Sequence, residues 1–321
     1  ILPMIVYNLD KDDQLSPPSS TAVLIYFDFH GSWQLAARQS IYWGENKWRA
    51  FATVGTGAMN RRFFGVGRDT SVVSNDTSNY FWTRDAVNSI SLSCYRKIYS
   101  GLYAGLEYAF NSHFIDEGNP DENDEMSRSG IKPGEKDKVS VFVPTFVWDN
   151  RNNIFWTKKG YYANLTLQLP DKIFAKSQDF SSISGWVNGY HNLFEGKRNL
   201  TLAWHLYFQK GWGELSYHQM ATYGRGDHAM GYRYGKYVNN SEITTQVEVR
   251  KDVWKFVSLG GYFGTGKTFE SKEKIGNSVW LHFGGLRTYF NIIPSRDIRL
   301  RLDFAFARKD NGFYLGIGQG F

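Results

Sequence analysis

Apolar and polar residues alternate with a period of two along much of the chain. Every even-numbered residue between positions 298 and 306 is apolar, whereas the odd-numbered positions include Arg299, Arg301 and Asp303. Successive side chains of a strand point to opposite faces, so this pattern predicts β-strands with one apolar and one polar face. The same alternation recurs in segments 161–169, 200–209 and 243–250.

Candidate strands follow one another about every 20 residues, which is roughly ten residues for a membrane-crossing strand plus a turn or loop. A closed antiparallel barrel prefers an even number of strands, so an odd count means that one strand is miscounted, missing or unpaired. Two long segments interrupt the rhythm: the acidic segment 115–137, which we expect to be a solvated external loop, and segment 211–241. There is no linker, and we expect residues 1–321 to form a single outer-membrane β-barrel domain. The fifteen predicted strands lie near residues 2–8, 20–29, 32–43, 46–57, 80–95, 98–112, 138–149, 159–169, 181–194, 197–210, 242–252, 254–265, 277–291, 296–308 and 311–321.

The last predicted strand, from Asn311 to Phe321, has an apolar face and a glycine face. Phe313, Leu315, Ile317 and Phe321 share the first, and Gly316, Gly318 and Gly320 share the second. A small-residue inner face and an aromatic residue at the end are typical of the closing strand of a membrane barrel. The alternative is the final strand of a soluble β-sandwich, whose strands are usually shorter and whose outer face is polar.

Composition agrees with a barrel that spans a membrane through strands. Of the 321 residues 17% are aromatic, yet the mean hydropathy is −0.44. No run of about 18 apolar residues exists, which excludes a transmembrane helix. A polar lumen explains the low hydropathy, because every second strand residue faces it. No leader precedes the first strand, so we expect a mature or trimmed chain.

The net charge of +6 comes from basic residues that are spread along the chain without a lysine-rich tail. This distribution favours acidic lipid headgroups or lipopolysaccharide as partners and disfavours nucleic acid.

Motifs for catalysis or metal binding are not recognisable in the sequence. The seven histidines show no spacing such as H-E-x-x-H. Ser182 and Ser184 lie near His191, but nothing in the sequence orients them as a catalytic pair. The single cysteine, Cys94, falls on an apolar face, where a small buried or lipid-facing side chain is expected. We therefore expect no enzymatic activity, no cofactor and no metal.

Three segments carry a family resemblance. The first is WDNRNNIFWTKKGYY at 148–162, the second is FFGVG at 63–67, and the third is the closing aromatic strand. In this order they resemble the BamA/TamA-like outer-membrane assembly-barrel superfamily, the bacterial surface antigen family. The resemblance implies sixteen strands, or fourteen if the second strand, expected between Leu9 and Pro17, is absent. The motif positions are Asp149, Arg151, Gly160, Phe63, Phe64 and Gly65.

The segment from Gly211 to Ser241 occupies the place of the family's long sixth loop, which folds back into the lumen. In the family an arginine at the loop tip meets an aspartate on the barrel wall; here Met230 and Gly264 stand in those places. The joint loss is coherent, because one buried charge without its partner would cost several kcal/mol. We expect the loop to insert nevertheless, held by Tyr232, Tyr234 and an arginine such as Arg225 or Arg233. The predicted tip is Met230, Gly231, Tyr232 and Arg233, and the predicted docking wall is Phe263, Gly264 and Gly266.

The resemblance implies insertion or translocation of proteins or lipids at the outer membrane of a Gram-negative bacterium. No periplasmic polypeptide-transport-associated domain is present, so the chain is expected to be a short family member. The physical basis would be a weak seam between the first and last strands, because Pro3 lacks an N–H and glycines pack little. The seam residues are Pro3, Gly316, Gly318, Gly320 and Phe321. The alternative is a passive or plugged pore, or a structural barrel. Other outer-membrane proteins, or a second copy forming a homodimer, are further partners that the aromatic outer wall would allow.

Overall fold

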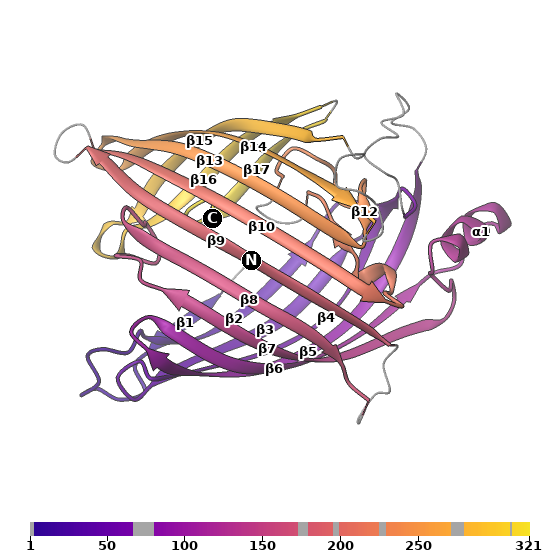
Figure 1. The fold of residues 1–321 in the computed structure, drawn as a ribbon, viewed down its shortest axis with the longest axis horizontal. Coiled ribbons are helices and arrows are strands. Elements are labelled where there is room, and N and C mark those ends of the chain that lie inside the picture. Colours follow the sequence, from indigo (N-terminus) through magenta and orange to yellow (C-terminus); the bar gives the residue numbers. More distant parts are fainter. Residues whose placement is uncertain are drawn as a thin grey trace.

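Most of the chain forms one continuous antiparallel sheet. The computed structural model describes residues 3–66, 80–172, 179–194, 199–224, 229–270, 279–308 and 310–321. Within these residues fifteen strands follow in chain order, each paired with the next (Figure 1). They are β1 (Met4–Tyr7), β2 (Ser19–Phe27), β3 (Trp33–Trp43), β4 (Trp48–Phe63), β5 (Phe81–Tyr99), β6 (Leu102–Ile115), β7 (Lys136–Asp149), β8 (Gly160–Pro170), β9 (Phe180–Phe194), β10 (Leu200–Gly213), β13 (Ser241–Trp254), β14 (Val257–Phe269), β15 (Leu281–Ile293), β16 (Ile298–Ala307) and β17 (Asp310–Ile317).

The predicted all-β, antiparallel barrel architecture is confirmed, and each of the fifteen predicted strands corresponds to one strand of the sheet. The described residues contain neither sixteen nor fourteen sheet strands, the even numbers that the resemblance implies. A second correction concerns the last strand, which ends at Ile317 because the chain turns at Gly318, with φ +95°.

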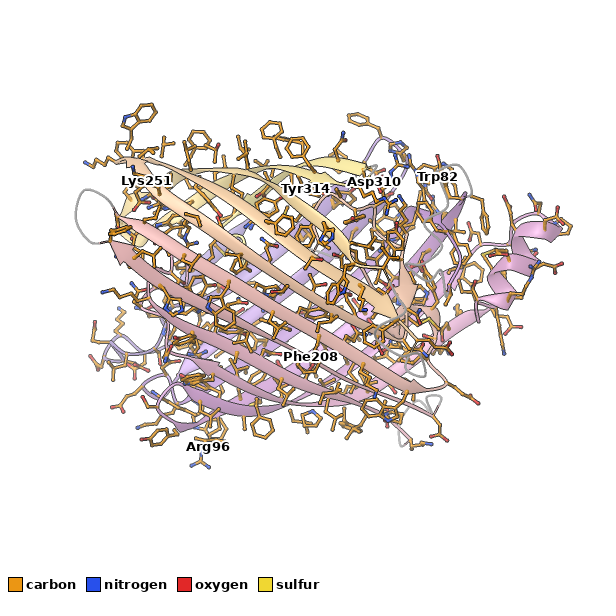
Figure 2. All side chains as sticks on the ribbon, turned by 45° about the horizontal axis from the view of Figure 1, so that its top comes forward. Trp82, Arg96, Phe208, Lys251, Asp310 and Tyr314 are labelled. Carbon is orange, nitrogen blue, oxygen red and sulfur yellow. The ribbon has the colours of Figure 1, made fainter. Side chains whose placement is uncertain are left out.

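The sheet curls round on itself, and its two faces differ as the alternation predicts (Figures 1 and 2). On β16, Phe304 and Phe306 are 52% and 60% exposed, whereas Arg301 and Asp303 are buried. The apolar face is therefore the outer wall, and the buried core is the charged lumen. Cys94 lies on the outer wall and is exposed, one of the two positions expected for it.

The longest connections all join strands at one rim of the barrel, here called the long-loop rim. The other rim has turns of two to five residues together with the longer connections 8–18 and 150–159. The long-loop rim includes connections 64–80, 116–135, 171–179, 214–240 and 270–280.

Helical structure is confined to the connections. The acidic connection predicted as a solvated loop contains α1 (Pro120–Arg128), which a capping box of Asn119 and Glu122 begins. The described residues also form two 3₁₀ turns, η2 (Tyr217–Gln219) and η4 (Pro294–Arg296), and the two-stranded pair β11 (Ala221–Thr222) and β12 (Val238–Asn239). Among the described residues, no helix has the length and apolar character needed to cross a membrane.

Candidate functional site in the barrel lumen

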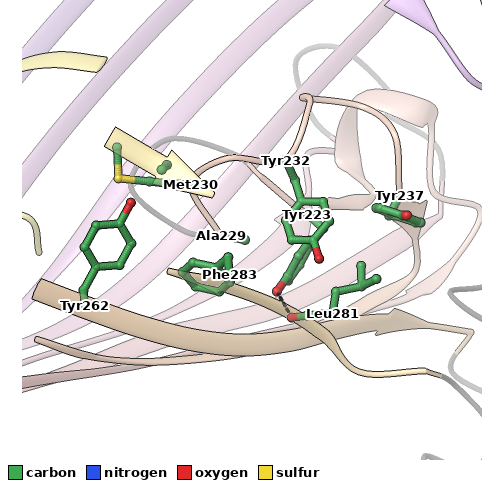
Figure 3. Close-up of a cluster of buried hydrophobic side chains, with 9 residues drawn as sticks. Tyr223, Ala229, Met230, Tyr232, Tyr237, Tyr262, Leu281 and Phe283 are labelled. Carbon is green, nitrogen blue, oxygen red and sulfur yellow. Dashed lines mark hydrogen bonds between the residues drawn. The ribbon is translucent and has the colours of Figure 1, made fainter. Parts of the chain in front are cut away.

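Residues 214–240 connect β10 to β13 and are here called the lumen loop. Its described residues, 214–224 and 229–240, pack against the inner wall of β14 to β17. Its core is a buried cluster in which Tyr223 contacts Tyr232 and the strand side chain Phe283, and Phe283 in turn contacts Tyr262 (Figure 3). The Tyr223 hydroxyl donates to the Leu281 carbonyl oxygen at 2.9 Å, and the Tyr232 hydroxyl donates to that of His282 at 2.8 Å. Two tyrosines thus hold the loop on β15 through hydrogen bonds to backbone carbonyl oxygens.

The predicted loop tip lies in this docked part. Met230 Sδ accepts a hydrogen bond from Arg287 Nη2 at 3.3 Å, and the Gly231 N–H donates to the Tyr314 hydroxyl at 3.0 Å. Gly231 has φ +100°, and a Cβ there would lie 3.1 Å from that of Ala307, so the tip approaches β16 through glycine.

Basic residues anchor the loop on the other side of the tip. Arg233 Nε lies 3.1 Å from one carboxylate oxygen of Asp310, and Lys236 Nζ lies 2.7 Å from the other. Tyr234, expected to hold the loop, is 41% exposed and lies under the Arg61 guanidinium. Arg225, the other expected arginine, falls outside the described residues.

The three predicted wall positions are placed differently by the structure. A Cβ on Gly264 would overlap the Phe283 ring, and one on Gly266 would lie 2.7 Å from the Tyr223 ring. Both glycines therefore make room for the aromatic cluster. The prediction that Phe263 belongs to the docking wall is wrong, because its side chain points to the outer wall, is 60% exposed and stacks on His282. Residues of a strand alternate, so Phe263 cannot share the inner face of its neighbours.

A buried charge network lies beneath the loop tip. Arg287 Nε is 2.6 Å from an Asp303 carboxylate oxygen, and Arg287 Nη1 is 3.0 Å from one of Glu248; all three side chains are 0% exposed. The second oxygen of Asp303 accepts from Arg301 Nε at 2.7 Å, and the second of Glu248 accepts from the Tyr289 hydroxyl at 2.5 Å. Every carboxylate oxygen thus has a donor, which a buried charge requires.

Residues 318–321, here called the terminal segment, cross the lumen instead of continuing β17. Gln319 Oε1 accepts from the Thr157 N–H at 2.9 Å, and the Gln319 carbonyl oxygen accepts from Arg301 Nη1 at 2.6 Å. The Phe321 carbonyl oxygen accepts a hydrogen bond from Tyr190 on β9. A Cβ on Gly320 would overlap the Arg287 guanidinium. Gly320 therefore lets the terminal segment approach the charge network.

The first family motif shapes the turn between β7 and β8 and sends it into the lumen. Asp149 and Arg151 form a two-pronged ion pair with N···O distances of 2.8 and 2.9 Å. Gly160 has φ +111°, and a Cβ there would lie 2.6 Å from the Asn150 carbonyl oxygen. The turn carries Trp156, whose ring is 4.2 Å from the Arg250 guanidinium carbon. The motif thus connects a rim turn to the charged lumen.

The second motif lies at the long-loop rim. Phe63 is 2% exposed and packs on the rings of Phe81 and Tyr217. Phe64 contacts Tyr80, and Gly65 has φ +84°. Phe63 therefore links the rim to η2, near the start of the lumen loop, and Phe64 packs on Tyr80 at the same rim.

The two edges of the sheet are β1 and β17. In the described part of the chain no backbone hydrogen bond joins them. β1 is only four residues long, and Pro3, just before it, contributes its carbonyl oxygen to Val23 N–H at 3.0 Å. The Gly316 backbone lies against the Arg301 guanidinium. Of the predicted seam residues, Pro3 and Gly316 lie at two strand edges that are not paired with each other. The prediction is wrong for Gly318, Gly320 and Phe321, which belong to the terminal segment in the lumen.

Two lumen residues escape the motif analysis, and a third, Trp156, lies inside the first motif without a role having been assigned to it. Arg287 joins the network, Gln319 holds the terminal segment, and Trp156 packs on Arg250. The inner-face alternation of β15 could have identified Arg287, because Leu286 and Phe290 on the same strand point outward. Nothing in the sequence indicates that Gln319 leaves the strand.

A curled antiparallel sheet around a charged, buried lumen that a loop enters defines a transmembrane β-barrel with an inserted loop. No protein-family model matches the sequence, and no curated protein matches it. Several solved structures share the fold. BamA from Haemophilus ducreyi lacking POTRA domains 1–3 is similar with a TM-score of 0.56 and 11% identity, over 99% of this chain and 75% of that one.

Two CdiB structures are similar to a comparable degree. CdiB from Acinetobacter baumannii gives a TM-score of 0.57 and 10% identity over 93% of this chain and 53% of its own. CdiB from Escherichia coli gives 0.59 and 10% over 98% and 61%. The chain thus spans little more than half the length of the CdiB structures. At this identity the likeness shows the barrel fold alone.

Proposed function

We propose that the chain is an integral outer-membrane barrel that assists insertion or translocation of proteins or lipids through the seam between β1 and β17. The fold it shares with BamA and CdiB, and the sequence resemblance to assembly barrels, support this class of activity. The net charge of +6 supports acidic lipid headgroups and lipopolysaccharide as partners.

The main support for the proposal is that, among the described residues, the free edge of β17 is not paired with β1. The chain leaves β17 at Gly318 and is held in the lumen by Arg301, Thr157 and Tyr190. Holding the terminal segment there keeps it from extending the strand. An unpaired strand edge exposes N–H and C=O groups that template pairing with another chain. The outward side chains of β17, such as Leu315, are apolar and suit lipid contact.

The experiment locks the seam. In a Cys94→Ser background, Ile5→Cys on β1 and Leu315→Cys on β17, both on the outer wall, are joined with bis-maleimides of graded length. The matched control joins Ile25→Cys and Leu35→Cys, which face each other on the outer wall of the paired strands β2 and β3. Activity is the rate at which a small unrelated barrel protein folds into vesicles that contain the purified protein. We expect the seam link to abolish acceleration and the control link to leave it unchanged.

Two results would reject the proposal: no acceleration by the unlocked protein, or equal acceleration with the seam locked. Lipid scrambling in the same vesicles distinguishes lipid movement from protein insertion. A homodimer is tested by the mass of the protein–detergent complex.

The alternative, a plugged pore, rests on the charged lumen and the loop that fills it. Planar-bilayer conductance distinguishes the two functions. The seam proposal expects little current from the intact protein and a clear current once residues 214–240 are replaced by a short linker. A steady current from the intact protein, without lipid or protein movement, would favour the pore.

A further inference from the structure

Three side chains with metal-ligating atoms meet at the long-loop rim, although they are far apart in the sequence. Asp85 comes from β5, His113 from β6 and His218 from η2. One ligand atom of each lies within 4.8 Å of the other two. His113 Nδ1 is 3.1 Å from Asp85 Oδ1, and His218 Nδ1 is 3.8 Å from Asp85 Oδ2.

These separations are close to those of a zinc site. With Zn–N and Zn–O bonds of about 2.0–2.2 Å in tetrahedral geometry, ligand atoms lie roughly 3.3–3.6 Å apart. The Asp85–His113 separation of 3.1 Å is slightly shorter than that spacing, and the Asp85–His218 separation of 3.8 Å is slightly longer, so small shifts of both imidazoles would reach it. The two imidazole rings stack at 3.5 Å with an angle of 11°. They have to tilt so that both nitrogens point at one ion.

The surroundings support an ion with one open coordination position. Asp85 is 3% exposed, and the side chains of His113 and His218 are 15% and 9% exposed, so the ligands are largely shielded from water. Both histidines also line a cavity of about 430 Å³ that opens at the rim. The cavity gives an ion a way in and leaves space for a water molecule as the fourth ligand.

We propose that Asp85, His113 and His218 bind one Zn²⁺ ion. Two imidazoles and one carboxylate with an open position form a donor set that suits zinc. Sequence spacing could not reveal this site, because one ligand comes from the lumen loop and two from the wall. The inference is independent of the proposed activity.

Arg61 provides a competing charge. Its Nη1 lies 3.9 Å from Asp85 Oδ2, and its side chain is 35% exposed, so it can move toward solvent when an ion binds. Since the guanidinium and Zn²⁺ share one carboxylate, removing the arginine charge should strengthen zinc binding.

Zinc would fasten the start of the lumen loop to the wall. His218 belongs to η2, whose Tyr217 already packs on Phe63. A bound ion would add coordination bonds from η2 to β5 and β6. The loop residues just after η2 should then open less often in the zinc-loaded protein than in the chelator-treated protein.

The test is titration of the full chain, in detergent micelles, with zinc chloride against a chromogenic chelator. We expect one site, at least about tenfold weaker binding for His113→Ala and for His218→Ala, and tighter binding for Arg61→Gln. The matched control is His282→Ala, an exposed histidine on β15, which should bind as the parent does. Heat-modifiable migration on gels establishes that each variant is folded.

Saturable binding that His218→Ala leaves unchanged would overturn the proposal, as would the absence of saturable zinc binding in the parent. Preference for Mn²⁺ or Ni²⁺ over Zn²⁺ would overturn the metal assignment. If the wall variants do not fold, hydrogen exchange of residues 216–224 in the parent decides. Slower exchange with zinc that chelation reverses supports the site, and unchanged exchange rejects it.

Discussion

Replacing Arg287 by methionine should destabilise the barrel strongly, because it leaves Glu248 as a buried charge without a cation. Methionine keeps most of the volume of the arginine stem but donates no hydrogen bond. Asp303 keeps its ion pair with Arg301 at 2.7 Å, whereas Glu248 keeps only the Tyr289 hydroxyl at 2.5 Å. The uncompensated charge is therefore a single carboxylate that is 0% exposed.

Removing one partner of a buried pair typically costs 3–5 kcal/mol. Because the Tyr289 hydrogen bond remains and only one carboxylate is stranded, we expect Arg287→Met to lower the free energy of unfolding by about 3 kcal/mol. The matched variant is Arg287→Met with Glu248→Gln, which removes the stranded charge and keeps an acceptor for Tyr289. This double variant should recover most of the loss, since the two positions are directly coupled.

The assay is urea unfolding of the protein in lipid vesicles, followed by tryptophan fluorescence and by heat-modifiable migration. Both are extrapolated linearly to zero urea. A loss below about 1 kcal/mol for the single variant would show that the lumen solvates Glu248 well, against the buried-charge reasoning. A double variant no more stable than the single one would place the effect in packing instead of charge.

Three further changes test other contacts. Met230→Arg places a second guanidinium beside Arg287, so it should lower the free energy of unfolding by about 1–3 kcal/mol in the same assay, whereas Met230→Leu should be nearly neutral. A stabilised arginine variant would contradict this reasoning. Gly160→Ala should lower the free energy of unfolding by about 1–3 kcal/mol, because φ +111° and the Asn150 carbonyl oxygen leave no room for a Cβ. The neutral control is Gly261→Ala, where the atom nearest to a new Cβ is 4.0 Å away. Hydrogen bonds, chiefly the one from the Ser16 hydroxyl, lower the pKa of the Asp13 carboxyl to about 2. Because the folded-state pKa is depressed, the ionised carboxylate stabilises the folded turn above about pH 4, and this stabilisation is lost as the pH falls toward 2. Hydrogen exchange of turn 8–18 should therefore be faster in Asp13→Asn than in the parent at pH 6 and alike at pH 2, and equal rates at pH 6 would refute this.

The strands were predictable because one physical rule repeats along the chain. Because lipid lies on one side of the wall and a polar lumen on the other, apolar and polar residues must alternate along each strand. The faces of Phe304 and Asp303 can therefore be assigned from the neighbouring sequence alone. The capping box at Asn119 was also readable, although the acidic composition of the segment led us to predict a loop.

The lumen contacts were less predictable because they join distant strands. Glu248 and Arg287 lie 39 residues apart, and Gln319 meets Thr157 across 162 residues. Alternation gives the face of each residue but not its cross-lumen partner. Gly318 follows the strand pattern as well as Gly316 does, yet its φ of +95° takes the chain out of the sheet.

The number of strands determines the relative direction of the two strands at the seam. In the part of the chain that the structure describes, the sheet is a meander of fifteen antiparallel strands, so its first and last strands, β1 and β17, run parallel to each other. Direct pairing of the two would form a parallel ladder, which is slightly less stable per residue than an antiparallel one. A single guest strand that runs antiparallel to β1 is also antiparallel to β17. One such strand would satisfy both edges with antiparallel ladders and bring the barrel to sixteen, whereas a two-stranded hairpin would leave one mismatched pairing.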